Sequence, residues 1–436
     1  MKLLLRGGRL VDPSQQLDGD FDLLIEDGVV SAVEAREPDD GGAPLEVEGA
    51  EVRDVSGLVI TPGWIDMHIH LREPGQEYKE TVRSGTLAAA AGGFTAVACM
   101  ANTEPVNDNR SVTEHILKQA ERHPFARVYP IGAVSKGQRG EELAEIGEMV
   151  EAGVVAVSDD GHPVRNPELM RRVLEYAQQF DVPVIQHAQD MELTAGGVMH
   201  EGEWSTRLGL PGWPGAAEDI VVARDILLTE DAGGRYHVAH LSTARSLAMV
   251  RRAREQGLRV SCEVTPHHLL LTDELVAVSG YSPDAKMNPP LRSASDREAL
   301  IAGLVDGTIE AIASDHAPHH PDEKDVEFSL APFGIVGLET NLGLCHDRLV
   351  KSGIITLSRL VELFSTGPAR LLGVPGGSLK VGSPADVTLF DPEAEFTVSA
   401  SAFRSKSRNT PFEGWTLRGR PVGTLLGGRA VELPSD

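Results

Sequence analysis

Cysteine and long apolar runs are both scarce in this sequence of 436 residues. The three cysteines, Cys99, Cys262 and Cys345, lie far apart and form no Cys-X-X-Cys pair, which argues against a disulfide framework and a cysteine-based metal site. No stretch approaches the roughly 18 apolar residues of a membrane-spanning helix. The apolar stretch Leu3-Leu4-Leu5 is too short for a signal peptide. We therefore expect a cytoplasmic protein with free thiols and no membrane association.

Positive charge is also in short supply, because 40 lysines and arginines face 65 aspartates and glutamates. The resulting net charge of -25 argues against nucleic acid or an anionic membrane surface as a partner, since phosphate binding needs a cationic face. It does not exclude a small anionic substrate, which a few local groups can bind. A hydrophobic share of 41% is that of a globular protein with an ample core.

Strand-like segments occupy both ends of the sequence, and a repeating pattern occupies its middle. Residues 1–57 and the last sixty residues show short apolar segments separated by Gly, Asp and Pro, with weak helical periodicity. In the middle, apolar runs are each followed by a helix-compatible stretch, such as residues 80–91, which Gly92-Gly93 closes. The apolar runs lie at residues 64–70, 94–100, 127–134, 154–158, 183–187, 236–241, 259–264 and 309–314.

Eight buried strands that alternate with helices are typical of the α/β class and of a (β/α)8 TIM barrel. We predict this barrel, with a hydrolase site, over residues 58–370. We predict a small β-sandwich domain formed from both chain termini, residues 1–57 plus 371–436.

The ends of the predicted strands carry histidine and aspartate. Strand one ends in Asp66-Met67-His68-Ile69-His70, and alternate residues of a strand point to one face, so both imidazoles can reach one ion. Four later strands also deliver such a residue: Asp160, His187, His240 and Asp315. Because chemistry in these barrels lies at the carboxyl ends of the strands, the agreement favours a metal site over unrelated buried polar groups. We interpret Asp159 as a turn residue.

Four histidines and two carboxylates suit zinc, or a similar borderline divalent ion, and are enough for two ions. A carboxylate at the end of strand four can bridge them. A water bound to such an ion has its pKa lowered to about 7 and is a nucleophile at neutral pH. Asp315 can serve as a ligand and as the general base and acid that moves the proton. The predicted reaction is hydrolysis at a carbonyl, or its reverse.

Six segments form motifs that are specific when taken together: Asp66-Met67-His68-Ile69-His70-Leu71-Arg72-Glu73-Pro74-Gly75, Met100-Ala101-Asn102-Thr103, Ser158-Asp159-Asp160-Gly161, Lys286-Met287-Asn288-Pro289-Pro290-Leu291, Ser314-Asp315-His316-Ala317-Pro318-His319 and residues 331–339. These motifs resemble the amidohydrolase superfamily and, within it, the class I bacterial dihydroorotases. That family interconverts N-carbamoyl-L-aspartate and L-dihydroorotate in de novo pyrimidine (UMP) biosynthesis. One departure is Ala101, where the family usually has proline.

The resemblance implies roles for individual residues. Two zinc ions, bridged by Asp160 and a hydroxide, would be held by one set of four ligands and one of three: His68, His70, Asp160 and Asp315, then Asp160, His187 and His240. The substrate carboxylate would meet Arg72, Asn102 and His319, and the ring Asn288, Phe333 and Gly334, with His70 also in contact. The resemblance further implies a homodimer and allows an association with aspartate transcarbamoylase.

Two other readings stay open. Dihydropyrimidinases, hydantoinases and allantoinases typically bridge their metals with a carboxylated lysine, whereas no lysine lies between Val154 and His162, and Arg72 and Asn102 favour an anionic substrate. The second is a non-catalytic scaffold for aspartate transcarbamoylase. Such homologues lose metal ligands, and this chain keeps all six.

Two further features concern the rim. The polar stretch of residues 319–332 follows strand eight, and we expect it to be a mobile loop that closes over substrate. His267-His268 has no clear role, and core or supporting histidines are the favoured interpretation.

Overall fold

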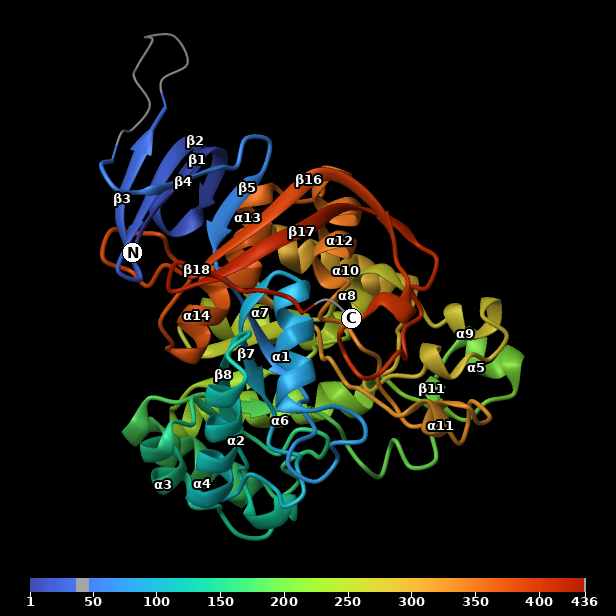
Figure 1. The fold of residues 1–436 in the computed structure, drawn as a ribbon. Helices are drawn as coiled ribbons and strands as arrows, with labels where there is room; N and C mark the ends of the chain where they lie inside the picture. The colour runs from blue at the N-terminus through green and yellow to red at the C-terminus, as the bar shows by residue number, and fades with distance from the viewer. Residues whose placement is uncertain (37–46, 435–436) are drawn as a thin grey trace.

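The computed structural model describes residues 1–36 and 47–434, which form two main β assemblies, with helices gathered around one of them (Figure 1). One assembly is a mixed sheet with the strand order β18-β17-β16-β5-β1-β2-β3, and β4 pairs with β1. The blue N-terminal strands and the red strands β16 and β17 share this sheet in Figure 1, because β16 pairs with β5. Its strands are β1 (Lys2–Asp12), β2 (Leu17–Glu26), β3 (Val29–Ala35), β4 (Glu51–Asp54), β5 (Val59–Pro62), β16 (Val387–Thr397), β17 (Thr416–Leu426) and β18 (Arg429–Ala430).

Alternating leucines and isoleucines give this terminal sheet its core. Leu3 lies opposite Ile25 and Leu5 opposite Leu23 in the antiparallel pair β1–β2, and all four are buried in one apolar cluster. Such directly opposed apolar pairs are the unit of sheet stabilisation. The prediction of a β unit built from both termini is confirmed. Its boundaries at residues 57 and 371 stay a prediction, and β5 lies just inside the segment assigned to the barrel.

The second assembly is an eight-stranded parallel sheet in the order β6-β7-β8-β9-β10-β13-β14-β15. Its strands coincide with the eight predicted apolar runs: β6 (Trp64–Ile69), β7 (Phe94–Cys99), β8 (Arg127–Gly132), β9 (Ala156–Ser158), β10 (Val184–Gln186), β13 (Tyr236–Val238), β14 (Val260–Val264) and β15 (Ala311–Ile312). A parallel bridge between Ile69 and His316, with a hydrogen bond from His70 N to His316 O at 2.9 Å, joins the first strand to the segment after the last. The prediction of a β/α barrel is confirmed.

Helices connect the barrel strands. Helix α1 begins where Thr81 accepts a hydrogen bond from Ser84 N and ends at Gly92, as the glycine pair predicted. A minor parallel pair, β11 (Met199–His200) and β12 (Gly212–Trp213), lies after β10. The helices are α1 (Val82–Ala91), α2 (Arg110–Arg122), α3 (Ile146–Ala152), α4 (Pro167–Ala177), α5 (Glu203–Leu208), α6 (Ala216–Ala232), α7 (Ala244–Glu255), α8 (Pro266–Leu270), α9 (Leu275–Val278), α10 (Ala294–Val305), α11 (Pro321–Lys324), α12 (Asn341–Cys345), α13 (Leu357–Val361) and α14 (Gly367–Leu372).

The terminal sheet packs against the start of the barrel strands. Trp64, the first residue of β6, is fully buried and stacks on Phe364 with a centroid distance of 5.3 Å. Phe390 of β16 lies 5.7 Å from the same indole ring. An ion pair between Arg127 of β8 and Asp386, with 2.6 Å between nitrogen and oxygen, adds a polar contact. The sheet therefore supports the end of β6 opposite to its histidines.

One connection leaves the sheet for the other end of the barrel. Between β16 and β17 the chain runs through residues 398–415, and Ser405 and Asn409 of this stretch contact residues near the carboxyl ends of β6 and β15. The terminal sheet thus reaches both ends of the barrel.

Two predictions concern membrane-spanning helices and the state of the cysteines, and the described residues can be compared with both. None of the helices in residues 1–36 and 47–434 is long and apolar enough to cross a membrane. The three cysteines are buried and unpaired, as expected.

Candidate metal centre and substrate cavity

Six side chains from five strand ends converge on one rim of the barrel. His68 lies in β6, and each of the others follows a strand: His70 directly after β6, Asp160 after β9, His187 after β10, His240 after β13 and Asp315 after β15. All six are at most 8% exposed. The parallel strands bring their carboxyl ends together, so residues up to 247 positions apart become neighbours, as the strand-end pattern predicted.

Asp160 lies at the centre of this group. Its Oδ1 is 3.4 Å from His68 Nε2, 3.4 Å from His187 Nδ1 and 3.5 Å from His240 Nε2. Its Oδ2 is 3.6 Å from His70 Nε2. A carboxylate that faces four imidazoles has the geometry of a bridging ligand.

Asp315 also faces two of the same histidines. Its Oδ1 is 3.1 Å from His70 Nε2 and 3.6 Å from His68 Nε2. The described residues contain two groups of three side chains that could each hold an ion. Within each group the ligand atoms lie within 4.8 Å of one another. One group is His68, His70 and Asp315, and the other is His68, Asp160 and His240. The side chains are therefore close enough to share ions.

Hydrogen bonds on the outer side of the rings set which nitrogen carries a proton. His68 Nδ1 lies 2.6 Å from Glu263 Oε1, and His70 Nδ1 lies 2.9 Å from Asn102 Oδ1. His187 Nε2 lies 2.9 Å from Gln189 Oε1. Each partner oxygen accepts, so each of these rings donates outward and turns a lone pair inward.

The inward-facing atoms fit a cation. His187 Nδ1 and His240 Nε2 lie 2.9 Å apart, close enough for both ring nitrogens to reach one ion. His68 Nε2 and Asp160 Oδ1 are buried without a hydrogen-bond partner. Buried polar atoms are rarely left unpaired, and nitrogen and carboxylate donors suit zinc. The residues present therefore fit a divalent metal.

Electrostatics keep the two aspartates ionised. Burial alone would raise the pKa of Asp160, but the contacts with His68, His187 and His240 outweigh it and hold that pKa well below its usual value. The pKa of Asp315 is lowered as well, because the His70 contact outweighs burial. Both groups are therefore carboxylates at neutral pH.

A cavity of about 340 Å³ opens beside these side chains. Its lining includes every residue that the sequence assigned to substrate: His70, Arg72, Asn102, Asn288, His319, Phe333 and Gly334. No lysine is among its lining residues in the described part of the chain. The structure thus brings the predicted metal and substrate residues to one place.

Arg72 and Asn102 are oriented by their neighbours. Arg72 Nε donates to Pro318 O at 3.2 Å, and the guanidinium is buried, so its two outer nitrogens remain for a ligand. Asn102 Oδ1 accepts a hydrogen bond from His70 Nδ1, and Asn102 Nδ2 lies beside Gly161 at the cavity. Together they offer a planar cation and a neutral donor, which is a carboxylate-binding pattern.

His319 is held in one tautomer. Its Nε2 lies 2.7 Å from Phe333 O, so this nitrogen donates and Nδ1 carries a lone pair. Burial and the nearby charges of Arg72, Lys324 and Lys79 lower the pKa of His319 to about 2. His319 is therefore neutral, and the positive charge in this part of the cavity belongs to Arg72.

Three residues at the rim have a strained backbone. Arg72, His240 and Asp315 have φ values of +59°, +31° and +47°, in the left-handed region that residues with a side chain rarely adopt. Strain of this kind costs on the order of 1–3 kcal/mol per residue and persists where surrounding structure requires it. Its concentration at one rim is typical of a functional site.

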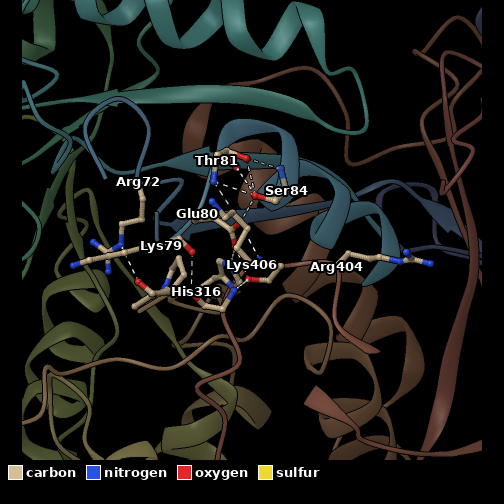
Figure 2. Close-up of polar contacts among 12 residues, drawn as sticks. Arg72, Lys79, Glu80, Thr81, Ser84, His316, Arg404 and Lys406 are labelled. Carbon is tan, nitrogen blue, oxygen red and sulfur yellow. Dashed lines mark hydrogen bonds and ion pairs between the residues drawn. The ribbon is translucent and has the colours of Figure 1, made fainter. Parts of the chain in front are cut away.

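Glu80 contacts Ser84, His316 and Lys406, as Figure 2 shows. Its buried carboxylate accepts hydrogen bonds from Ser84, from Ser405 Oγ and, at 3.2 Å, from His316 Nε2. His316 follows Asp315 directly, so Glu80 ties the end of β15 to α1 and to residues 404–409. Sequence reasoning assigned Glu80 no role beyond the helix that follows β6.

The sequence alone did not predict a role for Glu263 or Gln189 either. Glu263 is fully buried in β14 and contacts both His68 and, at 3.4 Å, His237. Glu263 lies within an apolar strand run, and a buried acid at such a position could have indicated a supporting role. Gln189 bridges His187 and Asn288 through one oxygen, and its position two residues after His187 was the only hint.

Asp159 and the His267-His268 pair lie outside the cluster. Asp159 accepts from Val134 N at 2.8 Å and Ser135 N at 3.0 Å, which agrees with a turn-supporting role. His268 is held by Thr265 and by Pro289 O, whereas His267 Nε2 is buried without a hydrogen-bond partner. The interpretation of His268 as a supporting core residue is consistent with these contacts.

The loop after β15 packs on the loop after β6. Glu323 lies 3.1 Å from Lys79 Nζ and accepts from Tyr78 at 3.4 Å. Lys324 Nζ donates to Pro283 O and Pro332 O at 3.1 and 2.9 Å. His319 and Pro332 of this loop line the cavity, and closure of the loop over substrate stays a prediction.

A closed β/α barrel with imidazoles and carboxylates at one rim defines the amidohydrolase class. Residues 57–246 match the family model described as dihydro-orotase-like. The chain is 54% identical over 431 residues to a dihydroorotase of Citrifermentans bemidjiense, with 99% of both proteins covered, and 51% identical to one of Syntrophotalea carbinolica over the full length of both. The chain belongs to the dihydroorotase family.

Solved structures of other cyclic-amide hydrolases share the fold. An L-hydantoinase from Arthrobacter aurescens superposes with a TM-score of 0.86 at 26% identity, covering 98% of this chain and 95% of its own. A dihydropyrimidinase from Brevibacillus agri gives a TM-score of 0.81 at 25% identity, covering 99% and 95%. The likeness supports the barrel and terminal sheet, while the higher identities favour dihydroorotase over these relatives.

Proposed function

We propose that this protein is a dihydroorotase, which interconverts N-carbamoyl-L-aspartate and L-dihydroorotate in pyrimidine biosynthesis. The observation that carries the proposal is the shared cavity, in which an arginine fork lies beside a group of four histidines and two aspartates. A cyclic amide with a carboxylate substituent is the ligand that such a cavity fits. The relatives at 51–54% identity bear the same name.

Zinc is the metal we propose, with two ions per subunit. His68, His70, Asp160 and Asp315 would hold one ion, and Asp160, His187 and His240 the other, with Asp160 and a hydroxide between them. The central position of Asp160 supports its role as the bridge. When bound, such ions supply a nucleophile at neutral pH and polarise a carbonyl.

Asp315 is the residue that we propose to move the proton. In the direction of hydrolysis, a C–O bond forms at the ring carbonyl carbon while the ring C–N bond breaks. Asp315 accepts the proton of the attacking water and delivers it to the departing nitrogen, so the carboxylate is regenerated. Its low pKa and its place beside His70 suit a group that must be ionised before each turnover.

Arg72, Asn102 and His319 would orient the substrate carboxylate, and Asn288 with the Phe333-Gly334 backbone would contact the ring. Arg72 provides the charge, because His319 is neutral in this arrangement. Asn102 links the two functions of the site, since the same amide that offers a donor to the substrate fixes the tautomer of His70. The substrate is held with its ring against the metal side of the cavity.

The test is a metal-defined assay with carbamoyl aspartate, dihydroorotate, hydantoin and dihydrouracil. We expect turnover of the first two and little of the neutral rings, because these leave Arg72 buried without a counter-charge. Turnover of only the neutral rings would refute the assignment in favour of a hydantoinase or dihydropyrimidinase. A purified chain that binds no zinc and gains no activity with added metal would favour the scaffold for aspartate transcarbamoylase. A homodimer, association with that enzyme and a cytoplasmic location stay predictions.

A further inference from the structure

Asn409 lies in the stretch between β16 and β17, far in sequence from the cavity, yet its side chain contacts the cavity loop. Asn409 is 5% exposed. Its Nδ2 donates to Ala317 O at 3.0 Å and to Gly334 O at 3.1 Å. Its Oδ1 accepts from His319 N at 3.2 Å. Every polar atom of the amide is therefore paired with backbone of one loop.

These contacts join the two ends of the loop, residues 317–334, which we call the rim loop. Ala317 is at its start and Gly334 at its end, and one amide group spans both. The Asn409 backbone adds a fourth contact, because Val336 N donates to Asn409 O at 2.9 Å. Asn409 thereby fixes the distance between the segment that carries His319 and the segment that carries Phe333.

The chemistry of the position requires an asparagine. Two carbonyl oxygens need two N–H donors and one backbone N–H needs an acceptor, and a primary amide supplies all three in one plane. An aspartate at this position would set a carboxylate oxygen against two carbonyl oxygens. An alanine would leave three buried backbone groups without their partner, which is costly because such groups are normally paired.

The stretch that presents Asn409 is itself firmly held. Lys406 N donates to Glu80 at 3.2 Å (Figure 2), and Ser405 Oγ donates to the same carboxylate. These two contacts attach the stretch to the loop after β6, so Asn409 rests on the part of the barrel that carries Arg72.

We propose that Asn409 is a positioning residue for substrate binding, which sets the rim loop so that His319 and the Phe333-Gly334 backbone face Arg72 across the cavity. The proposal rests on the substrate roles given to these residues under the proposed function. Asn409 touches neither the cavity nor the six candidate metal ligands in the contacts described, so its effect must pass through the loop. Loss of Asn409 should weaken substrate binding more than it slows chemistry.

The test compares Asn409→Ala and Asn409→Asp with the wild type and with Ser407→Ala as a matched control. Ser407→Ala removes the hydrogen bond from Ser407 Oγ to Lys79 O, 2.8 Å long and part-buried, from the same stretch but removes none from the rim loop. In Asn409→Ala we expect the KM for both substrates to rise about tenfold, kcat to change less than about threefold, and zinc content to stay the same. Asn409→Asp should have at least as large an effect on KM, and Ser407→Ala should stay close to the wild type.

Hydrogen exchange of the metal-loaded proteins without substrate is the second readout. Amides of residues 317–336 should exchange at least about tenfold faster in Asn409→Ala, with residues 64–70 unchanged. An unchanged KM, or equal effects in Ser407→Ala, would overturn the proposal. If Asn409→Ala does not fold, Asn409→Asp carries the same comparison, and exchange like that of wild type in this variant would likewise overturn it. If the proposed function is wrong, the wild-type protein will turn over neither substrate. Faster hydrogen exchange in the variants would still show that Asn409 holds the rim loop.

Discussion

Glu263→Gln should weaken zinc binding while leaving the fold intact. Glu263 is fully buried, and its Oε1 lies 2.6 Å from His68 Nδ1. Glutamine has nearly the same shape and can still accept this hydrogen bond, so the orientation of the ring is retained. The negative charge, which makes the imidazole a stronger electron donor toward an ion, is lost.

The size of the effect follows from the exchange of a charged acceptor for a neutral one. Charge-assisted hydrogen bonds are roughly twice as strong as neutral ones, and partners of this kind typically change metal affinity by about 10- to 100-fold. His237 Nε2 lies 3.4 Å from Glu263 Oε2, and in the variant it faces the glutamine amide instead of a carboxylate. We therefore expect zinc affinity to fall by at least about tenfold, or about 1.4 kcal/mol.

The measurement is a competition for zinc against a chromophoric chelator, with circular dichroism to check the fold. Glu339→Gln is the matched control, because Glu339 is a partly buried carboxylate that accepts from backbone Arg404 N and Ser405 N and contacts no histidine in the described interactions. Zinc affinity of Glu263→Gln within about threefold of the wild type, or an equal loss in Glu339→Gln, would refute the reasoning.

The remaining predictions concern the substrate, the proton, the loop and pH. Arg72→Lys should raise the KM for carbamoyl aspartate about tenfold or more in steady-state assays with unchanged zinc content, because a lysine cannot bind a carboxylate through two nitrogens. An unaltered KM would contradict the binding of the substrate carboxylate by the Arg72 guanidinium. Asp315→Ala should lower kcat by about 10²- to 10⁴-fold while at least one zinc remains on the His187 side, so near-normal turnover would remove its role as base. Hydrogen exchange of residues 319–332 should slow when a substrate analogue binds, and identical exchange would argue against a closing loop. Burial and the neighbouring Glu80 raise the pKa of Glu339 to about 7 from an ordinary 4.5, against the backbone hydrogen bonds that lower it, so its stabilising contribution is complete below pH about 4.5 and is lost as pH rises through about 7; urea unfolding should show a stability difference between wild type and Glu339→Gln that falls over this window, and a constant difference would exclude the shift.

The barrel and its rim could be predicted because both depend on short-range patterns. A buried strand reads as an apolar run, and its carboxyl end is the next residue or two, so His70, His187 and Asp315 could be placed on one rim without any contact information. The handedness and order of a β/α barrel then supply the long-range geometry. The terminal sheet was predicted as a unit, but the pairing of β16 with β5 depends on side-chain packing that no local pattern encodes.

The supporting contacts could not be predicted for a physical reason. His68 and Glu263 are 195 residues apart, and their 2.6 Å contact depends on the rotamers of two side chains in different strands. Asn409 lies in an irregular stretch whose path across the rim follows from hydrogen bonds with Glu80, which periodicity cannot report. Such partners act through other residues, so their own sequence context carries little sign of the chemistry.

The closure of the barrel between β6 and the segment after β15 has a consequence for the synthesis of the protein. His70 and Asp315 are separated by 245 residues, and their contact exists only when the two ends of the barrel meet. A chain emerging from the ribosome therefore carries its first histidines long before the last carboxylate has been made, and β6 presents an open edge during that time. Premature termination before β15 leaves the candidate ligand set without Asp315. Translation thus supplies all six candidate ligands only when it reaches Asp315, with 121 of the 436 residues still to follow.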